Sequence, residues 1–154
     1  MKLSNILLSF LLLIGYADNT SAQADDARVI AHADVSQNTI SERQLRRVFM
    51  LKQRSWEGGQ AISLVVFSSE NEKHAIFLRH QLKLFPYQLE REWNKLIFSG
   101  QSAPPIIATD TETMLRIVSS TPGAIGYIVG DPDHSLALFN DADHRVKTLE
   151  VTTP

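Results

Sequence analysis

The sequence predicts an α/β domain with a mixed β-sheet flanked by helices. Segments of strand character alternate with segments of helical periodicity, and the clearest strand is the apolar, β-branched run ISLVVF at 62–67. Three further strand-like segments then follow one another closely, at 124–129, 136–139 and 146–151. Strands that alternate with helices and then run together are typical of an α/β fold with a mixed sheet.

The first 24 residues have the pattern of a cleaved signal peptide. Lys2 gives a positive start, the run 6–17 is apolar, and Ala22-Gln23-Ala24 fits the small-x-small cleavage pattern. An uncleaved anchor is the alternative, but the apolar run is short for a membrane span. We therefore expect an exported, periplasmic protein whose mature chain, residues 25–154, is one domain without membrane insertion.

Composition excludes several classes of function. The chain has no cysteine, which excludes disulfides, zinc–thiolate sites and thiol catalysis. Its 15 Lys and Arg against 17 Asp and Glu give a formal net charge of −2, which argues against nucleic acid as a partner.

The first half of the mature chain begins with a short strand at 28–32, followed by a helix at 40–50. Two capping boxes compete for the start of this helix, Thr39 with Glu42 and Ser41 with Gln44. Its exposed side gathers Arg43, Arg46 and Arg47. This cationic side is expected to be solvated, or alternatively to dock an acidic partner.

Helices fill the region between the strand at 62–67 and the closing strands. Ser69 and Glu72 form a capping box for a helix that extends to Leu84, and a second helix spans 87–98 after Pro86. After a loop at 99–105, Thr109 and Glu112 cap a short helix that ends near Ser119.

Familiar catalytic motifs are missing. The sequence has no G-x-S-x-G, H-E-x-x-H or G-x-x-x-x-G-K-[ST] pattern. The segments DPDH at 131–134 and DADH at 141–144 resemble a metal site, but a strand between them would place the two turns about 20 Å apart. We therefore expect no enzyme activity, no metal and no cofactor.

The best candidate for a binding site lies where the strand at 62–67 turns into a helix. Ser68, Ser69 and Asn71 place short polar side chains beside free backbone N–H groups at a helix N-terminus, which suits a small oxyanion. The alternative is that a serine simply caps the helix. Glu70 and Glu72 favour this alternative, because carboxylates at the same end repel an anion.

Three stretches, taken in order, resemble phosphate ABC-transporter substrate-binding proteins. They are TISERQLRRVFMLKQRSWEGGQAISLVVF, REWNKLIFSGQSAPP and VSSTPGAIGYI, and the last contains the Pro-Gly-Ala-Ile-Gly-Tyr signature of that family. The resemblance implies a type II periplasmic-binding-protein fold. Full-length members close two lobes on phosphate, whereas this chain has room for a single lobe.

The chain departs from the family at the ligand site. Family members carry an Arg and a Ser-Gly-Thr here, whereas this chain has Phe67 followed by Ser-Ser-Glu-Asn-Glu-Lys. The resemblance therefore implies a non-catalytic solute-binding domain that binds phosphate or another small oxyanion weakly. The substrate-binding residues expected on this basis are Ser68, Ser69, Asn71, Lys73 and His74, the last two as sources of positive charge.

A second hypothesis is an interaction module that has lost ligand binding. The lobe would then dock a periplasmic or membrane protein partner, or form a homodimer that rebuilds a two-lobed cleft. In either case the glycines of Pro-Gly-Ala-Ile-Gly-Tyr are expected to be structural. Gly123 ends a helix, and Gly126 allows close backbone approach within a strand.

Overall fold

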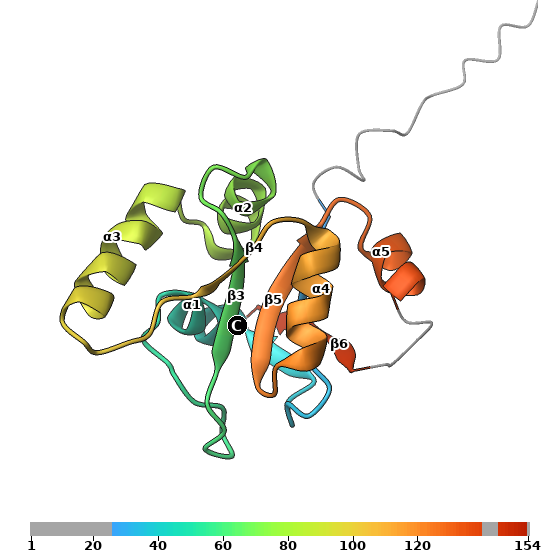
Figure 1. Cartoon of the computed structure of the whole chain (residues 1–154), viewed down its shortest axis with the longest axis horizontal. Coiled ribbons are helices and arrows are strands. Elements are labelled where there is room, and N and C mark those ends of the chain that lie inside the picture. Colours follow the sequence, from blue (N-terminus) through green and yellow to red (C-terminus); the bar gives the residue numbers. More distant parts are fainter. Residues whose placement is uncertain (1–25, 140–144, 154) are drawn as a thin grey trace, which may run out of the picture.

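Six strands form one mixed sheet in the order β2-β6-β1-β5-β3-β4 (Figure 1). The computed structural model describes residues 26–139 and 145–153. The strands are β1 (Ala27–His32), β2 (Thr39–Ser41), β3 (Ser63–Phe67), β4 (Ile106–Ala108), β5 (Ala124–Val129) and β6 (Val146–Thr152).

Five of the six described strands run in the same direction and end at the same side of the sheet, and β1 runs opposite to them. β3 pairs in parallel with both β4 and β5, whereas β1 pairs antiparallel with β5 and β6, and β2 pairs in parallel with β6. Phe67, Ala108 and Val129 therefore end β3, β4 and β5 along one edge, which we call the carboxyl edge.

Helices connect the parallel strands and cover both faces of the sheet. They are α1 (Glu42–Phe49), α2 (Glu72–Phe77), the π-helix η1 (Leu78–Leu82), α3 (Pro86–Phe98), α4 (Thr111–Ser120) and α5 (Pro132–Phe139). In Figure 1, α4 lies in front of β5, and α3 and α5 lie at opposite sides of the view.

The middle of β5 shows how the two faces are packed. Successive residues of a strand point to opposite faces. A Cβ on Gly126 would lie 2.6 Å from the Met114 sulfur and 3.2 Å from Val118, so α4 packs closely on that face. On the other face the Tyr127 ring stacks on Phe77 at 3.9 Å. Gly126 is thus the residue that permits close packing of the α4 side chains, whereas the sequence predicted close approach of backbone at this glycine.

The predicted fold class is confirmed, and most of the expected elements form. The strands expected at 28–32, 62–67, 124–129 and 146–151 correspond to β1, β3, β5 and β6. Of the two predicted caps, Ser41 is the N-cap observed, because its hydroxyl accepts a hydrogen bond from the Gln44 N–H at 3.1 Å. Residues 39–41 also form the short strand β2.

Two elements differ from the sequence prediction. Residues 136–139 were expected to be a strand but lie in α5, because Pro132 suits the first turn of a helix and the Asp131 carboxylate accepts a hydrogen bond from the His134 N–H at 3.0 Å. No element was predicted at residues 106–108, which form the strand β4. The argument that a strand would hold the turns at 131–134 and 141–144 about 20 Å apart therefore no longer applies. Residues 141–144 lie outside the described part of the chain.

Two helices begin at residues other than the predicted caps. Asn71 caps α2 in place of Ser69, and Asp110 caps α4 in place of Thr109. Within residues 26–139 and 145–153, none of the helices has the length and hydropathy needed to cross a membrane. The expected signal peptide, residues 1–24, lies outside the described residues.

Candidate functional site

The candidate site is formed where β3 and β4 each turn into a helix at the carboxyl edge. The first junction contains Ser68 to Asn71 and leads into α2, and the second contains Thr109 and Asp110 and leads into α4. Because β3 and β4 are parallel neighbours, the two junctions lie side by side. Two helix N-termini, each with a partial positive charge, therefore face the same edge.

Hydrogen bonds within the first junction set its shape. The Asn71 side chain accepts from the Lys73 N–H at 2.9 Å, and the Ser68 carbonyl accepts from the Asn71 N–H at 2.9 Å. The Ser68 hydroxyl accepts a longer bond, 3.4 Å, from the Glu70 N–H. Ser68 and Ser69 are exposed, whereas Asn71 is half-buried. The structure thus brings together three of the predicted residues, with Asn71 in the role of helix cap.

Lys73 links the two junctions. Its ammonium group donates a hydrogen bond to the Thr111 hydroxyl at 2.9 Å and lies 6.0 Å from the centre of the Phe67 ring. The side chain is half-buried, so the ammonium group is held between α2 and α4 rather than extended into solvent. The structure therefore places the positive charge of Lys73 beside the N-terminus of α4, at the carboxyl edge.

The second junction was not recognised as part of the site from the sequence. The Asp110 carboxylate accepts from the Thr113 N–H at 2.7 Å and from the Thr109 hydroxyl at 2.9 Å. The hydrogen bond from the Thr113 backbone contributes most to holding the pKa of Asp110 below its ordinary value, and the hydrogen bond from the Thr109 hydroxyl contributes next. The Thr-Asp-Thr sequence at 109–111, which follows Ile-Ile-Ala, could have indicated this junction. Its place at the site is evident only once β4 is known to be a strand beside β3.

His74 does not belong to the candidate site. It is fully buried, and burial lowers its pKa to about 4 against a weaker opposing effect of Glu90. The Tyr127 hydroxyl accepts from the Phe67 N–H at 3.1 Å and is hydrogen-bonded to Nδ1 of His74 at 2.6 Å. The prediction that His74 supplies positive charge is therefore wrong, because the imidazole is neutral at pH 7.

The buried histidine also has an unsatisfied ring nitrogen. Nδ1 is hydrogen-bonded to Tyr127, whereas Nε2 is buried and has no hydrogen-bond partner among the described residues. Burial likewise raises the pKa of the Tyr127 hydroxyl. His74 and Tyr127 thus form a neutral, buried pair behind the carboxyl edge, and their contacts position Phe67 and α2.

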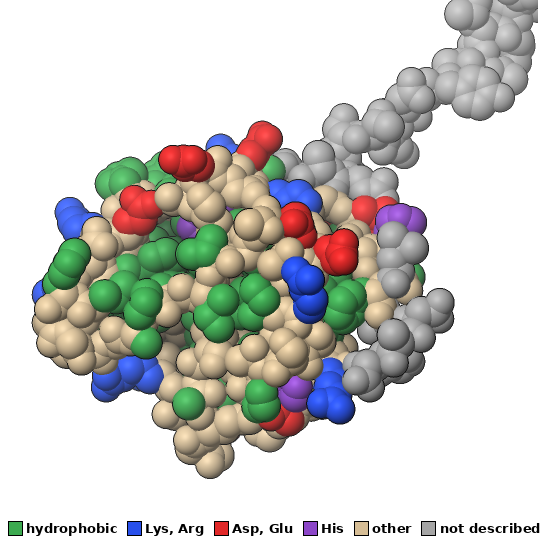
Figure 2. Space-filling model, in the orientation of Figure 1, with side chains coloured by type: hydrophobic (Ala, Val, Ile, Leu, Met, Phe, Trp, Pro, Cys, Tyr) green, Lys and Arg blue, Asp and Glu red, His purple; other side chains and the backbone are tan. Residues whose placement is uncertain are grey.

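The carboxyl edge carries more negative than positive side chains. The two junctions carry four carboxylates and only two cations among the described residues. The carboxylates are those of Glu70, Glu72, Asp110 and Glu112, and the cations are those of Lys73 and Arg116. Figure 2 shows acidic side chains over α2 and the start of α4, along the upper part of that view. A bound anion would therefore meet repulsion from the rim as well as attraction from Lys73 and the helix termini.

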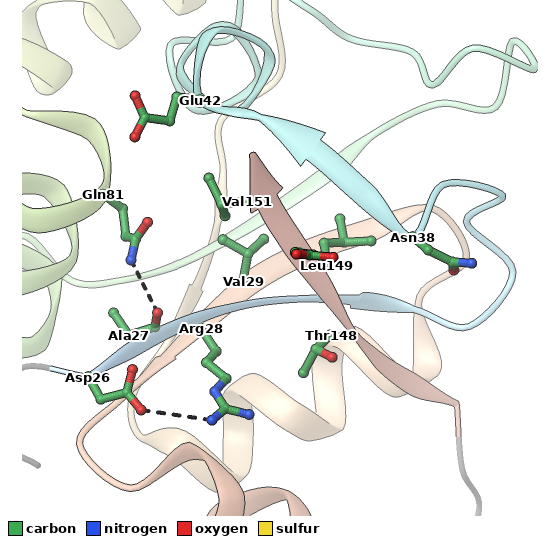
Figure 3. Close-up of a pocket in the computed structure, with 11 residues that line it drawn as sticks. Asp26, Ala27, Arg28, Val29, Asn38, Glu42, Gln81, Thr148, Leu149 and Val151 are labelled. Carbon is green, nitrogen blue, oxygen red and sulfur yellow. Dashed lines mark hydrogen bonds and ion pairs between the residues drawn. The ribbon is translucent and has the colours of Figure 1, made fainter. Parts of the chain in front are cut away.

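A cavity of about 580 Å³ lies away from these junctions, where β6 leaves β1 to pair with β2 (Figure 3). Gln81 donates to the Ala27 carbonyl at 3.2 Å on one side of it. Arg28, on its wall, forms two hydrogen bonds with Asp133 and lies 4.0 Å from Asp26. Because this guanidinium already faces two carboxylates, the cavity does not suit an anion.

A smaller cavity of about 410 Å³ lies between α4 and α5 and borders the second junction at Thr111. Leu115 and Phe139 contribute apolar surface to its wall, and Arg116 contributes a cation. Over the described ranges 26–139 and 145–153, no cluster of three or more His, Asp or Glu side chains is arranged to hold a metal ion.

Solved structures that are similar to this chain include phosphate ABC-transporter substrate-binding proteins. PstS from Borrelia burgdorferi is 13% identical over 82% of this chain and 47% of its own, with a TM-score of 0.57. A putative phosphate ABC transporter substrate-binding protein from Clostridium perfringens, solved with bound phosphate, is 15% identical over 81% of this chain and 44% of its own, also with a TM-score of 0.57.

A phosphate-binding protein from Stenotrophomonas maltophilia is 17% identical over 81% of this chain and 38% of its own, with a TM-score of 0.53. No family model matches the chain, and no curated protein matches it either. The chain thus has the fold of a phosphate-binding protein and spans less than half the length of the structures named here. This result confirms the fold implied by the sequence resemblance.

Proposed function

We propose that this chain is a non-catalytic, exported solute-binding-type domain that binds phosphate or another small oxyanion weakly. The observation that supports the proposal best is the position of Lys73, whose ammonium group bridges the N-termini of α2 and α4 at the carboxyl edge. The binding residues we propose are Ser68, Ser69, Asn71 and Lys73, together with Thr111, which the sequence prediction did not include.

The chemistry of these groups suits a small oxyanion. A protonated lysine has three N–H donors, of which Thr111 takes one. The exposed hydroxyls of Ser68 and Ser69 lie on the same edge, and the ends of two helices add partial positive charge. The fold is that of a protein solved with bound phosphate, which makes phosphate the first anion to test.

Two features make the proposed binding weak. The rim carries Glu70, Glu72 and Glu112, all exposed, and these repel an anion. The serines are also exposed, so water screens each charge–charge contact several-fold relative to an enclosed site. We therefore expect dissociation constants nearer to millimolar than to micromolar.

Isothermal titration calorimetry of the mature chain with phosphate, sulfate and acetate tests this proposal. The variant Lys73→Met should lose most of the binding heat, whereas Lys95→Met, which removes an exposed lysine on α3, should retain it. Thr111→Val removes the hydroxyl that holds Lys73 and should weaken binding less. If the wild-type chain gives neither heat nor a thermal shift at millimolar anion, the binding proposal is refuted.

Export is part of the same proposal. Residues 1–24 have the pattern of a signal peptide, and the mature protein would act in the periplasm. Expression of the full chain followed by N-terminal sequencing of the periplasmic fraction should give a chain that begins at Asp25. Recovery of an uncleaved chain in the membrane fraction would contradict this part of the proposal.

The second candidate is an interaction module without a ligand. It is favoured by the excess of carboxylates over cations at the carboxyl edge, which is unusual for an anion site. The two candidates are distinguishable, because only the first predicts that binding heat depends on Lys73.

A further inference from the structure

The edge strand β4 exposes two adjacent apolar residues. The exposed fractions are 39% for Ile106 and 51% for Ile107, although these side chains point to opposite faces of the sheet. Within the described residues, β4 pairs with β3 alone, so its other side presents unpaired backbone groups. An edge of this kind is a template for pairing with another strand.

The opposite edge of the sheet is protected differently. β2 also has three residues, but its apolar residue, Ile40, is buried, and it is flanked by Thr39 and Ser41. Natural proteins protect edge strands with charged or polar side chains. β4 carries none, and its two isoleucines face solvent. β4 therefore lacks the protection that polar side chains give to β2.

The surface beside β4 is also apolar. A groove of about 300 Å³ lies next to the start of the strand, lined by Leu51, Ile62, Pro104 and Pro105 among others. Figure 2 shows hydrophobic side chains across the middle of this face, over β3 and β4. A partner strand along β4 would therefore find both unpaired backbone and an apolar recess.

Charges are distributed unevenly along the strand. At its start, Arg54 lines the same groove, and its guanidinium group donates to the Gln101 carbonyl. At its end, Asp110 and Glu112 are exposed. β4 therefore runs from a positive end to a negative end.

We infer that a second copy of this chain pairs its β4 antiparallel to this β4 across a two-fold axis, which joins the two sheets edge to edge. In an antiparallel pair, the start of each strand lies beside the end of the other. The positive end at Arg54 then faces the negative end at Asp110 and Glu112 of the partner, twice. This self-complementarity is the reason to assign the edge to a second copy.

The inference does not rest on anion binding. The proposed pairing uses the outer side of β4 along the length of the strand, whereas the proposed anion site lies at the carboxyl edge, where β3 and β4 end. The paired surface is short, because the strand has three residues. A short interface implies a dimer in concentration-dependent exchange with the monomer.

Sedimentation equilibrium of the mature chain over a concentration series tests the inference. The wild-type mass should rise from one chain towards two, and Ile107→Lys should raise the dissociation constant at least about tenfold, because it places a charge at the pairing edge. Phe98→Lys is the matched control: Phe98 is 88% exposed and is the last residue of α3, so it is not part of β4. This control should leave the dissociation constant unchanged.

A charge exchange sharpens the test. Arg54→Glu and Glu112→Lys should each weaken the dimer, and the chain that carries both changes should recover most of the wild-type association. Thermal unfolding of each variant at low concentration checks that the monomer remains folded. A chain that stays monomeric to millimolar concentration would overturn the inference and leave the edge to a different partner. A dimer that tolerates Ile107→Lys but is lost in Arg46→Glu, on α1, would also overturn it.

Discussion

The start of β5 and the end of β3 use polar groups in opposite ways. In the Pro122–Tyr127 segment the polar groups are held by residues distant in the chain: the Gly123 carbonyl accepts from the Trp56 indole at 2.9 Å, and its N–H donates to Asp34 at 3.1 Å. In the Ser68–Lys73 segment, hydrogen bonds are mostly local, and the serines are exposed.

This difference explains why one segment resembles a family and the other departs from it. A substitution in the first segment disturbs several elements at once, whereas a substitution at Ser68 or Ser69 changes mainly the surface. A binding site can therefore change while the fold is retained, and the fold alone does not determine the ligand.

The largest expected effect is at Gly123. Its φ of +74° lies in the left-handed region, and an added Cβ would meet the Ala61 carbonyl oxygen at 2.2 Å. Gly123→Ala should lower the free energy of unfolding by about 3 kcal/mol, since the conformational cost and the steric overlap add. Urea denaturation followed by circular dichroism measures it.

Gly59→Ala is the control for this experiment. Gly59 also has a positive φ, +83°, but no atom lies within 4 Å of an added Cβ. It should cost about 1 kcal/mol. Equal losses in the two variants would show that the contact with Ala61 is not important.

The second effect is a loss of stability in acid caused by His74. Its folded pKa of about 4 lies below its ordinary value of 6.5, so between these two values the unfolded chain binds a proton that the folded chain does not. Stability is therefore full above pH 6.5 and falls by about 3 kcal/mol as the pH is lowered to 4. Urea midpoints at pH 7, 6, 5 and 4 measure this slope.

Variants at two histidines separate this effect from other titrations. His74→Gln keeps an acceptor for the Tyr127 hydroxyl but removes the titrating ring, so the slope between pH 6.5 and 4 should become shallower. His80→Gln changes an exposed histidine and should leave the slope as it is. An unchanged slope in His74→Gln would contradict the assignment.

The third effect concerns the cap of α2. Asn71→Ala should destabilise the protein by about 1 kcal/mol, because it removes the acceptor of the Lys73 N–H. Ser69→Ala should change stability by less than about 0.5 kcal/mol, since Ser69 is exposed and does not cap the helix. Thermal unfolding of the two variants compares the observed cap with the one that the sequence favoured.

The sequence was a good guide to the fold wherever an element is long or buried. The apolar run of β3 was recognised, as was the helix at 87–98, which corresponds to α3 and buries Leu89 and Trp93. β4 was missed because it has three residues, two of them exposed. α5 was mistaken for a strand because a run of four residues does not distinguish the two periodicities.

The candidate site was only partly predictable. The junction at Ser68–Lys73 follows directly from a recognisable strand, but its contact with Thr111 depends on the pairing of β3 with β4. The placement of His74 was missed because the sequence does not show which side of α2 faces the core. Its burial follows from the packing of α2 against Tyr127.

The smallest effect is the most informative about the proposed ligand. Glu70→Gln and Glu72→Gln each remove an exposed like charge from the rim, and such charges are worth a few tenths to about 1 kcal/mol in water. Each variant should therefore bind phosphate about two- to fivefold more tightly, and the gain should shrink as salt is added.

Glu57→Gln, at an exposed turn between α1 and β3, should not change the affinity. Calorimetry at low and high salt measures all three. If the rim variants bind phosphate no better than Glu57→Gln, the anion does not bind at the carboxyl edge, whatever affinity the whole chain has.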